Sequence, residues 1–244
     1  MPLSPRLLRP IASGFNPKSI AGLKLWLDAS DSSTVTLNGS AVSQWGDKSG
    51  NGFHFSQSTA NNQPAYTGSI NGRSAISFDG VNDGLDRTGV TNANIADTTG
   101  ACAFAVYEIS GTDLQYAVLR TLTTGSGHDR FNSTGYHCYF RTSRFLSIPN
   151  PPPSTGLVLL TSSSNVSSDT QSVRVNGAQY QSQVCATTFA AWRALTGQAW
   201  AVGYDASWLT GSVGEVLIYG KALSATDISK VEKYLAAKWG VTVA

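Results

Sequence analysis

The sequence has few charged residues, only three glutamates and a single methionine. Charged residues make up 13% of the 244-residue chain, and the formal net charge is +2. The charged fraction is well below the roughly 25% of an ordinary globular protein. So small a net charge gives no bulk attraction to nucleic acid or to an acidic membrane surface. We therefore expect neither as a partner, and the low charge suits a chain that buries surface in an assembly.

Long hydrophobic runs and a complete cysteine framework are also lacking. No stretch approaches the roughly 18 apolar residues of a transmembrane helix, and residues 1–15 hold no apolar run long enough for a signal peptide. We expect a chain made in a host cytoplasm and not secreted through a signal peptide. Cysteine occurs only at Cys102, Cys138 and Cys185. An odd number argues against a full disulfide framework, and one bond between two of the three stays open.

What the sequence does contain is typical of strands and turns. Glycine occurs 24 times, and serine, threonine and asparagine are abundant. Strand-like runs recur about every 8–12 residues with turn signals between them, which favours a β-sandwich. Residues 156–161 read as a buried strand and 162–170 as a polar turn. We predict one domain over 20–244. Residues 1–19, rich in proline and leucine, form an N-terminal arm that is either a poorly ordered tail or an extended segment packing on a neighbouring subunit.

The stretch from Gly211 to Val241 predicts a strand, a tight turn and a short amphipathic helix. Ser224 suits the N-cap, with Asp227 three positions on as the acidic partner of a capping box. Apolar residues then recur at helical spacing as far as Trp239, and Gly240 follows as a stop. A helix with one apolar face must dock on another part of the fold.

Four motifs carry a resemblance to a known superfamily. They are LWLDASD (25–31), DKSGNG (47–52), SFDGVNDGL (77–85), and a closing segment with Glu215, Tyr219, Leu223, Ser224, Tyr234, Leu235, Lys238, Trp239 and Gly240. The chain resembles the concanavalin A-like lectin/glucanase superfamily, in the laminin-G-like modules found in bacterial and phage proteins. The resemblance implies an all-β jelly roll of two antiparallel sheets with a short C-terminal helix. Residues 100–198 carry no distinctive motif.

Some members of the superfamily are glycoside hydrolases, so the resemblance raises the possibility of a catalytic carboxylate pair. Such enzymes need two carboxylates about 5–10 Å apart across a cleft, and the family supplies them as Glu-x-Asp-x-x-Glu on one strand. The three glutamates here, Glu108, Glu215 and Glu232, form no such cluster. We therefore predict no enzymatic activity and no catalytic residues.

Calcium is the only ion or cofactor that the sequence suggests. Asp79, Asn82 and Asp83 offer three side-chain oxygens within five positions of a loop, and Ca²⁺ binds such oxygens. The resemblance implies the same, since acidic residues near this loop bind Ca²⁺ in pentraxin and laminin-G modules. The alternative is that Asp79 and Asp83 cap a tight turn.

Sugar binding needs exposed aromatic rings beside polar groups, because a sugar stacks on a ring and forms hydrogen bonds at its rim. The candidates are Trp192, Arg193, Tyr204 and Asp205. The other tryptophans are assigned to the core or to structural positions: Trp26, Trp45, Trp208 and Trp239.

Two functional hypotheses follow. The first is a non-enzymatic virion structural or appendage protein, such as a phage capsid decoration, tail or fibre component. Its partners would be other virion proteins, or a second copy of the chain through the arm. The alternative is a carbohydrate-binding module, free or carried on a virion, that recognises a glycan of the host surface. A fold alone does not decide between them.

Overall fold

The computed structural model describes residues 14–110, 116–121, 128–132, 135–137, 156–183, 189, 193, 199–204 and 208–244. Its helices are η1 (Pro17–Ser19), η2 (Ser32–Thr34), η3 (Ala60–Asn62), α1 (Asn92–Ile95) and α3 (Ala225–Trp239). Its strands are β1 (Leu23–Asp28), β2 (Val35–Asn38), β3 (Ala41–Trp45), β4 (Phe55–Ser56), β5 (Ala65–Ile70), β6 (Arg73–Asp79), β7 (Leu85–Thr88), β8 (Gly100–Ile109), β9 (Tyr116–Thr121), β10 (His128–Asn132), β11 (Gly135–His137), β12 (Gly156–Asn165), β13 (Thr170–Val175), β14 (Ala178–Gln183), β15 (Ala199–Val202) and β16 (Thr210–Tyr219).

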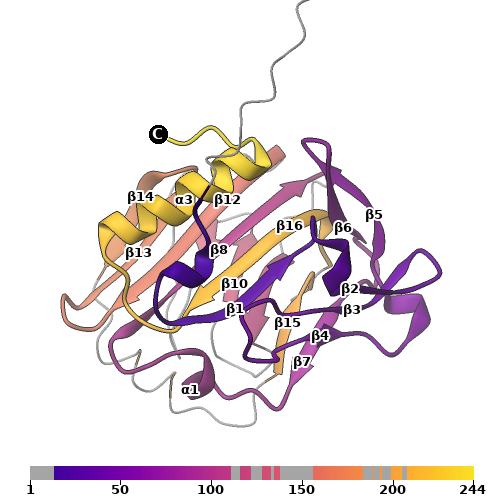
Figure 1. The fold of residues 1–244 in the computed structure, drawn as a ribbon, viewed down its shortest axis with the longest axis horizontal. Helices are drawn as coiled ribbons and strands as arrows, with labels where there is room; N and C mark the ends of the chain where they lie inside the picture. The colour runs from indigo at the N-terminus through magenta and orange to yellow at the C-terminus, as the bar shows by residue number, and fades with distance from the viewer. Residues whose placement is uncertain are drawn as a thin grey trace, which may run out of the picture.

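These strands form an antiparallel β-sandwich, as the sequence predicted (Figure 1). One layer runs β14-β13-β12-β8-β16-β6, with β1 also pairing with β16. The other runs β11-β10-β9-β15-β7-β4-β3, with β2 on β3, and β5 joins the two layers by pairing with both β6 and β3. A continuous apolar core lies between the layers, and α3 covers the outer face of the first layer (Figure 1).

Strand β8 shows why an apolar run without alternation belongs in this fold. Cys102, Phe104 and Val106 point to the cluster beneath α3, whereas Tyr107 and Ile109 point to the core between the sheets. Both faces of the strand are therefore buried, and both must be apolar. Burial of Cys102 also agrees with its interpretation as a small hydrophobic residue.

The terminal helix begins and ends where the sequence predicts. The Ser224 side chain accepts a hydrogen bond from the Asp227 N–H, and Gly240 takes a left-handed conformation with φ of 77°. A second glycine is needed for docking: a Cβ on Gly214 would come within 2.9 Å of the Trp239 ring, so the indole packs directly on the β16 backbone.

One local prediction is wrong. Ser162–Asn165 continue β12 instead of starting a polar turn, because all ten residues of β12 pair with β8, from Gly156↔Ile109 to Asn165↔Gly100. Small hydroxyl side chains fit this buried strand, where Ser162 and Ser164 are at most 1% exposed. The backbone pairing outweighs their preference for turns.

The N-terminal arm stays a prediction, because residues 1–13 lie outside the described part of the chain. From residue 14 onward the chain lies on the sandwich: Phe15 contacts the Tyr234 ring, and the Pro17 carbonyl accepts a hydrogen bond from the Tyr219 hydroxyl at 2.9 Å. Among the described helices, none combines the length and apolar character needed to cross a bilayer.

Candidate functional site

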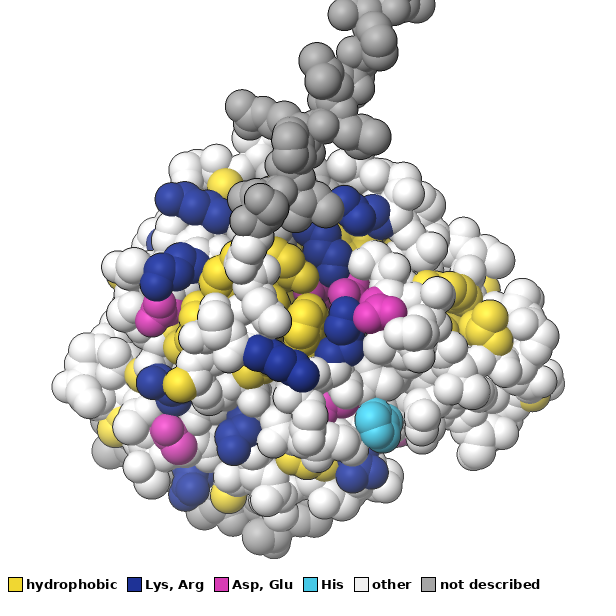
Figure 2. All heavy atoms as spheres, viewed as in Figure 1, with side chains coloured by type: hydrophobic (Ala, Val, Ile, Leu, Met, Phe, Trp, Pro, Cys, Tyr) yellow, Lys and Arg dark blue, Asp and Glu magenta, His cyan; other side chains and the backbone are white. Residues whose placement is uncertain are grey.

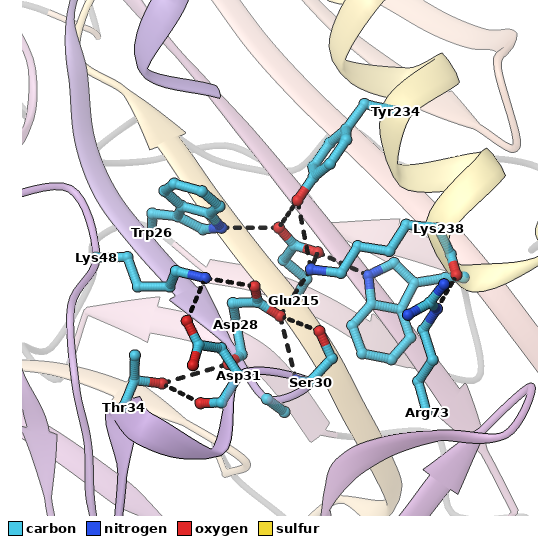
Figure 3. A network of polar contacts seen from close by, with 12 residues as sticks. Trp26, Asp28, Ser30, Asp31, Thr34, Lys48, Arg73, Glu215, Tyr234 and Lys238 are labelled. Carbon is cyan, nitrogen blue, oxygen red and sulfur yellow. Dashed lines mark hydrogen bonds and ion pairs between the residues drawn. The ribbon is translucent and has the colours of Figure 1, made fainter. Parts of the chain in front are cut away.

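A buried polar network joins α3 to the first sheet (Figure 3). At its centre the Glu215 carboxylate, 0% exposed, accepts four hydrogen bonds or ion pairs. The donors are Trp26 Nε1 at 2.7 Å, Trp239 Nε1 at 2.7 Å, Tyr234 Oη at 2.9 Å and Lys238 Nζ at 2.7 Å. Burial and the nearby negative charge of Asp28 raise the pKa of Glu215, against the opposing effect of Lys238. A carboxylate with every acceptor position in use has no capacity left for a ligand.

Two lysines complete the network and balance its acidic groups. Lys238 Nζ also lies 2.7 Å from Asp28, whose other carboxylate oxygen is 2.8 Å from Lys48 Nζ. Lys48 in turn pairs with Asp31 at 2.7 Å. Burial opposes ionisation of Asp28, but Lys238 and Lys48 outweigh it and hold the pKa of that carboxyl below its usual range. Figure 2 shows charged side chains of both signs meeting near the middle of this face, beside apolar ones.

The motif loop at 47–52 is bonded to β1 beside the same network, through Asp47 and Lys48. The Asp47 carboxylate accepts hydrogen bonds from the backbone N–H groups of Trp26, Ser49 and Phe53, at 2.8–3.1 Å. The bonds from Ser49 and Phe53 close the loop on itself, and the bond from Trp26 ties the loop to β1. Three of the four motifs therefore converge on one structural cluster that holds the terminal helix.

A shallow polar groove lies on the outer face of the second sheet. Its volume is about 450 Å³, and it is lined by Thr36, Asn38, Ser43, Gln44, Ser56, Gln57, Ser58 and Gln63. Gln44 pairs across strands with Ser56, and the neighbouring pair Trp45↔Phe55 is buried in the core. Because side chains alternate along a strand, Gln44 and Ser56 point away from the core and into the groove.

Two glutamines of the groove are fixed by hydrogen bonds at both ends of their amides. Gln63 donates to the Gln57 carbonyl at 2.7 Å and accepts from Asn38 at 3.2 Å. Gln57 donates to the Gly84 carbonyl at 3.1 Å and accepts from the Thr59 N–H at 3.0 Å. These bonds make a rigid floor. Within the described residues, the side chains of Gln44, Ser56 and Ser58 form no hydrogen bond, so their donors and acceptors face solvent.

An aromatic pair lies next to this floor. Tyr204 and Trp208 stack with ring centroids 4.8 Å apart, and Tyr204 Oη donates to Asp86 Oδ1 at 2.7 Å. Asp86 is the cross-strand partner of Ser56. The Tyr204 ring packs on Gly84, where an added Cβ would collide with it. The same glycine accepts the hydrogen bond of Gln57, so the groove floor and the aromatic pair share one anchor.

Two of the four predicted sugar-binding residues, Arg193 and Tyr204, lie in the described structure, and sugar binding by the four together stays a prediction. Tyr204 lies at the β15–β16 connection, whereas Arg193 donates its Nε hydrogen to the Ala96 carbonyl, at the end of α1. Trp192 and Asp205 lie outside the described residues. Trp26, Trp45 and Trp239 are buried as predicted, and Trp208 is partly exposed in its stack with Tyr204.

The predicted calcium residues lie together in the β6–β7 loop. Asp79 Oδ1 accepts from the N–H groups of Val81 and Asn82, and Asp83 Oδ2 accepts from the Asp79 N–H. These bonds are the turn-capping arrangement given as the alternative. In the part of the chain that the structure describes, no group of three or more acidic, histidine or cysteine residues could hold a metal. Burial, helped by the charge of Asp79, raises the pKa of Asp83 to about 6. Calcium binding stays a prediction.

Sequence reasoning missed the groove because its residues carry no motif. They are ordinary hydroxyl and amide side chains from β2, β3, β4 and the segment after β4. One signal was present: polar residues alternate with buried aromatic ones at Gln44-Trp45 and at Phe55-Ser56. Such alternation predicts a polar outer face, but not that several strands together form a groove.

Comparison with solved structures finds proteins of similar fold, among them parts of three sugar-processing enzymes. Domain 4 of AbnA, an extracellular arabinanase from Geobacillus stearothermophilus in complex with arabinotriose, matches with a TM-score of 0.61 and 12% identity, covering 86% of this chain and 98% of that one. A Trypanosoma rangeli sialidase matches with a TM-score of 0.60 and 14% identity, covering 90% and 33%. A GH54 arabinofuranosidase matches with a TM-score of 0.58 and 17% identity, covering 81% and 51%.

Other comparisons add no closer relative. No protein-family model and no curated protein sequence matches the chain. The chain spans about a third of the sialidase and about half of the arabinofuranosidase. The identities are low, so these likenesses show the fold: a β-sandwich of the kind found in carbohydrate-binding and glycosidase domains.

Two predictions are affected by these findings. The prediction that the chain has no enzymatic activity is contradicted, because the similar structures include an arabinanase, a sialidase and an arabinofuranosidase. The physical reason is that a one-strand motif tests only one way of pairing carboxylates. Residues on different strands can also bring two carboxylates together, as Asp28 on β1 and Glu215 on β16 show, although this buried pair is bound to Lys238 and belongs to the structural network. The virion structural role has no support from the similar structures, whereas the glycan-binding alternative does.

Proposed function

We propose that the chain is a carbohydrate-recognition domain that binds an oligosaccharide in the polar groove. The observation that carries this proposal is the groove of about 450 Å³ lined by eight hydroxyl and amide side chains. Its volume lies within the range of about 300–1,000 Å³ of small-ligand sites. Hydroxyl and amide groups both donate and accept hydrogen bonds, as sugar hydroxyls do. The Tyr204–Trp208 pair beside the floor supplies aromatic surface of the kind on which a sugar stacks.

The fold supports the same function. Domain 4 of the arabinanase is a single unit of nearly the same extent as this chain, and it was solved with arabinotriose bound. Recognition of a glycan by a β-sandwich of this size therefore has a structural precedent. The virion location predicted from the sequence remains a proposal, and in that setting the ligand would be a glycan of the host surface.

The test is calorimetric titration of the full chain with a panel of oligosaccharides, together with a measurement of released reducing sugar on the same panel. Gln44→Ala should weaken binding about 3- to 10-fold, which corresponds to one hydrogen bond. Thr226→Ala is the matched control, because Thr226 is exposed on α3, which covers the other sheet. Binding that is unchanged in Gln44→Ala and in Ser58→Ala would refute the groove as the site. No binding to any member of the panel would refute the function.

A further inference from the structure

Four asparagines of the described chain stand directly before a glycine: Asn38, Asn51, Asn71 and Asn176. Such a pair is chemically labile, because a glycine without a side chain lets its backbone nitrogen approach the asparagine amide unhindered. The reaction requires the amide carbon to turn towards that nitrogen, so it depends on reaching one reactive geometry. Contacts that hold the asparagine side chain in another position therefore slow it.

Two of these asparagines are held by several hydrogen bonds. The Asn51 amide donates to two carbonyls of β1 and to the Ser49 hydroxyl, at 2.9–3.2 Å. The Asn176 side chain accepts from the Leu159 N–H at 2.9 Å, and its backbone N–H and carbonyl are bonded to Leu159 and Ala244. At either residue these bonds would have to break before the side chain could react.

Asn71 is held by packing, whereas Asn38 is held only loosely. Asn71 takes a left-handed conformation with φ of 49°, and a Cβ on Gly240 would collide with its amide, which therefore lies against the glycine that ends α3. Asn38 is exposed at the end of β2, and the bond printed for its amide within the described residues is to Gln63 Oε1, at 3.2 Å. A Cβ on Gly39 would meet nothing within 4 Å, so the attacking nitrogen lies at an open turn.

We propose that Asn38 is a site of spontaneous deamidation, which replaces a neutral amide of the groove by a carboxylate. The Gly39 nitrogen attacks the amide carbon of Asn38 and forms a new C–N bond. The amide nitrogen leaves as ammonia, taking up the hydrogen of the Gly39 N–H, and a cyclic imide remains. Water then opens one of the two ring C–N bonds and gives aspartate or isoaspartate. The reaction consumes only water and needs no oxidant or reductant.

The product changes the groove at its floor. Asn38 is one of eight lining residues, none of which is charged. Its amide now donates to Gln63 Oε1, and a carboxylate oxygen in its place would set two acceptors against each other. Gln63 cannot turn to compensate without losing its 2.7 Å bond to the Gln57 carbonyl. Isoaspartate would also add a backbone carbon where Asn38 pairs with Ala41. We expect weaker ligand binding, a consequence that rests on the proposed function.

The experiment incubates the full chain at mildly alkaline pH and maps its peptides by mass spectrometry over time. Conversion at Asn38 should be about tenfold faster than at Asn51, where two more hydrogen bonds must break. It should also be faster than at Asn71 and Asn176. Asn38→Gln is the matched control: it keeps an amide in the groove but requires a larger ring, so the acidic species that ion exchange separates from the aged chain should be lost.

Each outcome bears on one proposal. Conversion that is slower at Asn38 than at any of the other three sites overturns the inference, as does an acidic species that persists in Asn38→Gln. Asn38→Asp copies the main charge change and should bind the oligosaccharide panel at least about threefold more weakly than the unmodified chain. Equal binding overturns the predicted effect on the groove. If the unmodified chain binds no member of the panel, the proposed function fails, and the peptide map still decides whether Asn38 reacts.

Discussion

If the charged network holds α3 on the sheet, replacing Lys238 by methionine should destabilise the protein. The ammonium lies 2.7 Å from both Asp28 and Glu215, and its side chain is 9% exposed. The two carboxylates are therefore held within about 5 Å of each other, where like charges at an effective dielectric constant near 20 repel by about 3 kcal/mol. Methionine keeps the apolar stem but removes the neutralising charge. We expect Lys238→Met to lower the free energy of unfolding by about 3–5 kcal/mol at pH 7, the range found when one partner of a buried pair is removed.

Urea unfolding followed by tryptophan fluorescence at several pH values measures this loss. The deficit should shrink at acid pH, because protonating one of the two carboxyls relieves their repulsion. Adding Glu215→Gln to Lys238→Met should recover part of the loss, since it removes the second charge. Lys233→Met is the control: Lys233 is exposed on the same helix, and the change should stay within about 0.5 kcal/mol. A loss below about 1 kcal/mol, or one that is the same at pH 4 and pH 7, would refute the reasoning.

Three further predictions address other parts of the fold. Because burial raises the pKa of Asp83 to about 6, the native state binds more protons than the unfolded chain between about pH 4 and pH 6, and stability falls as pH rises through that window. Asp83→Asn should then gain about 1–2 kcal/mol at pH 7 and nothing below about pH 4, which thermal melts across pH can check. Gly84→Ala drives a Cβ into the Tyr204 ring and should cost about 1–3 kcal/mol in urea unfolding; an unchanged midpoint would contradict the close packing. Glu232→Ala removes the carboxylate that lies 2.8 Å from the Arg174 guanidinium and leaves that cation only its bond to the Gly177 carbonyl. It should cost about 2 kcal/mol in the same assay, whereas a neutral result would show the pair to be dispensable.

The architecture was accessible from the sequence because local signals agree with the tertiary fold. The N-cap at Ser224 and the stop at Gly240 lie where α3 begins and ends, and burial on both faces explains the apolar run of β8. The failure at Ser162–Asn165 has the opposite cause. Composition favours a turn there, but pairing with β8 along the whole strand decides the structure, and that pairing is not visible in a local window.

The candidate site was not accessible in the same way. The sequence patterns used were aromatic residues beside polar ones and clustered acidic residues. They indicated Tyr204 but not the residues that it contacts, Asp86 and Trp208. The groove combines residues about 27 positions apart in the sequence, from Thr36 to Gln63. The register of β2, β3 and β4 brings its wall residues together, and bonds to backbone carbonyls fix the amides of its floor. Neither feature produces a recognisable sequence motif.

The motifs and the groove thus divide the molecule into two faces with different roles. Trp26, Glu215 and Trp239 are chemically distinctive because a buried carboxylate must have all its acceptors satisfied, which restricts what can surround it. A solvent-facing groove has no such restriction: Gln44 or Ser58 can be exchanged with little cost to folding, and only the ligand constrains them. A resemblance carried by the buried network residues therefore identifies the sandwich fold but does not indicate its ligand. Variants of Gln44 and Ser58 that bind differently yet unfold at the same urea concentration would demonstrate that separation, whereas coupled losses of binding and stability would show that the groove, too, is part of the structural core.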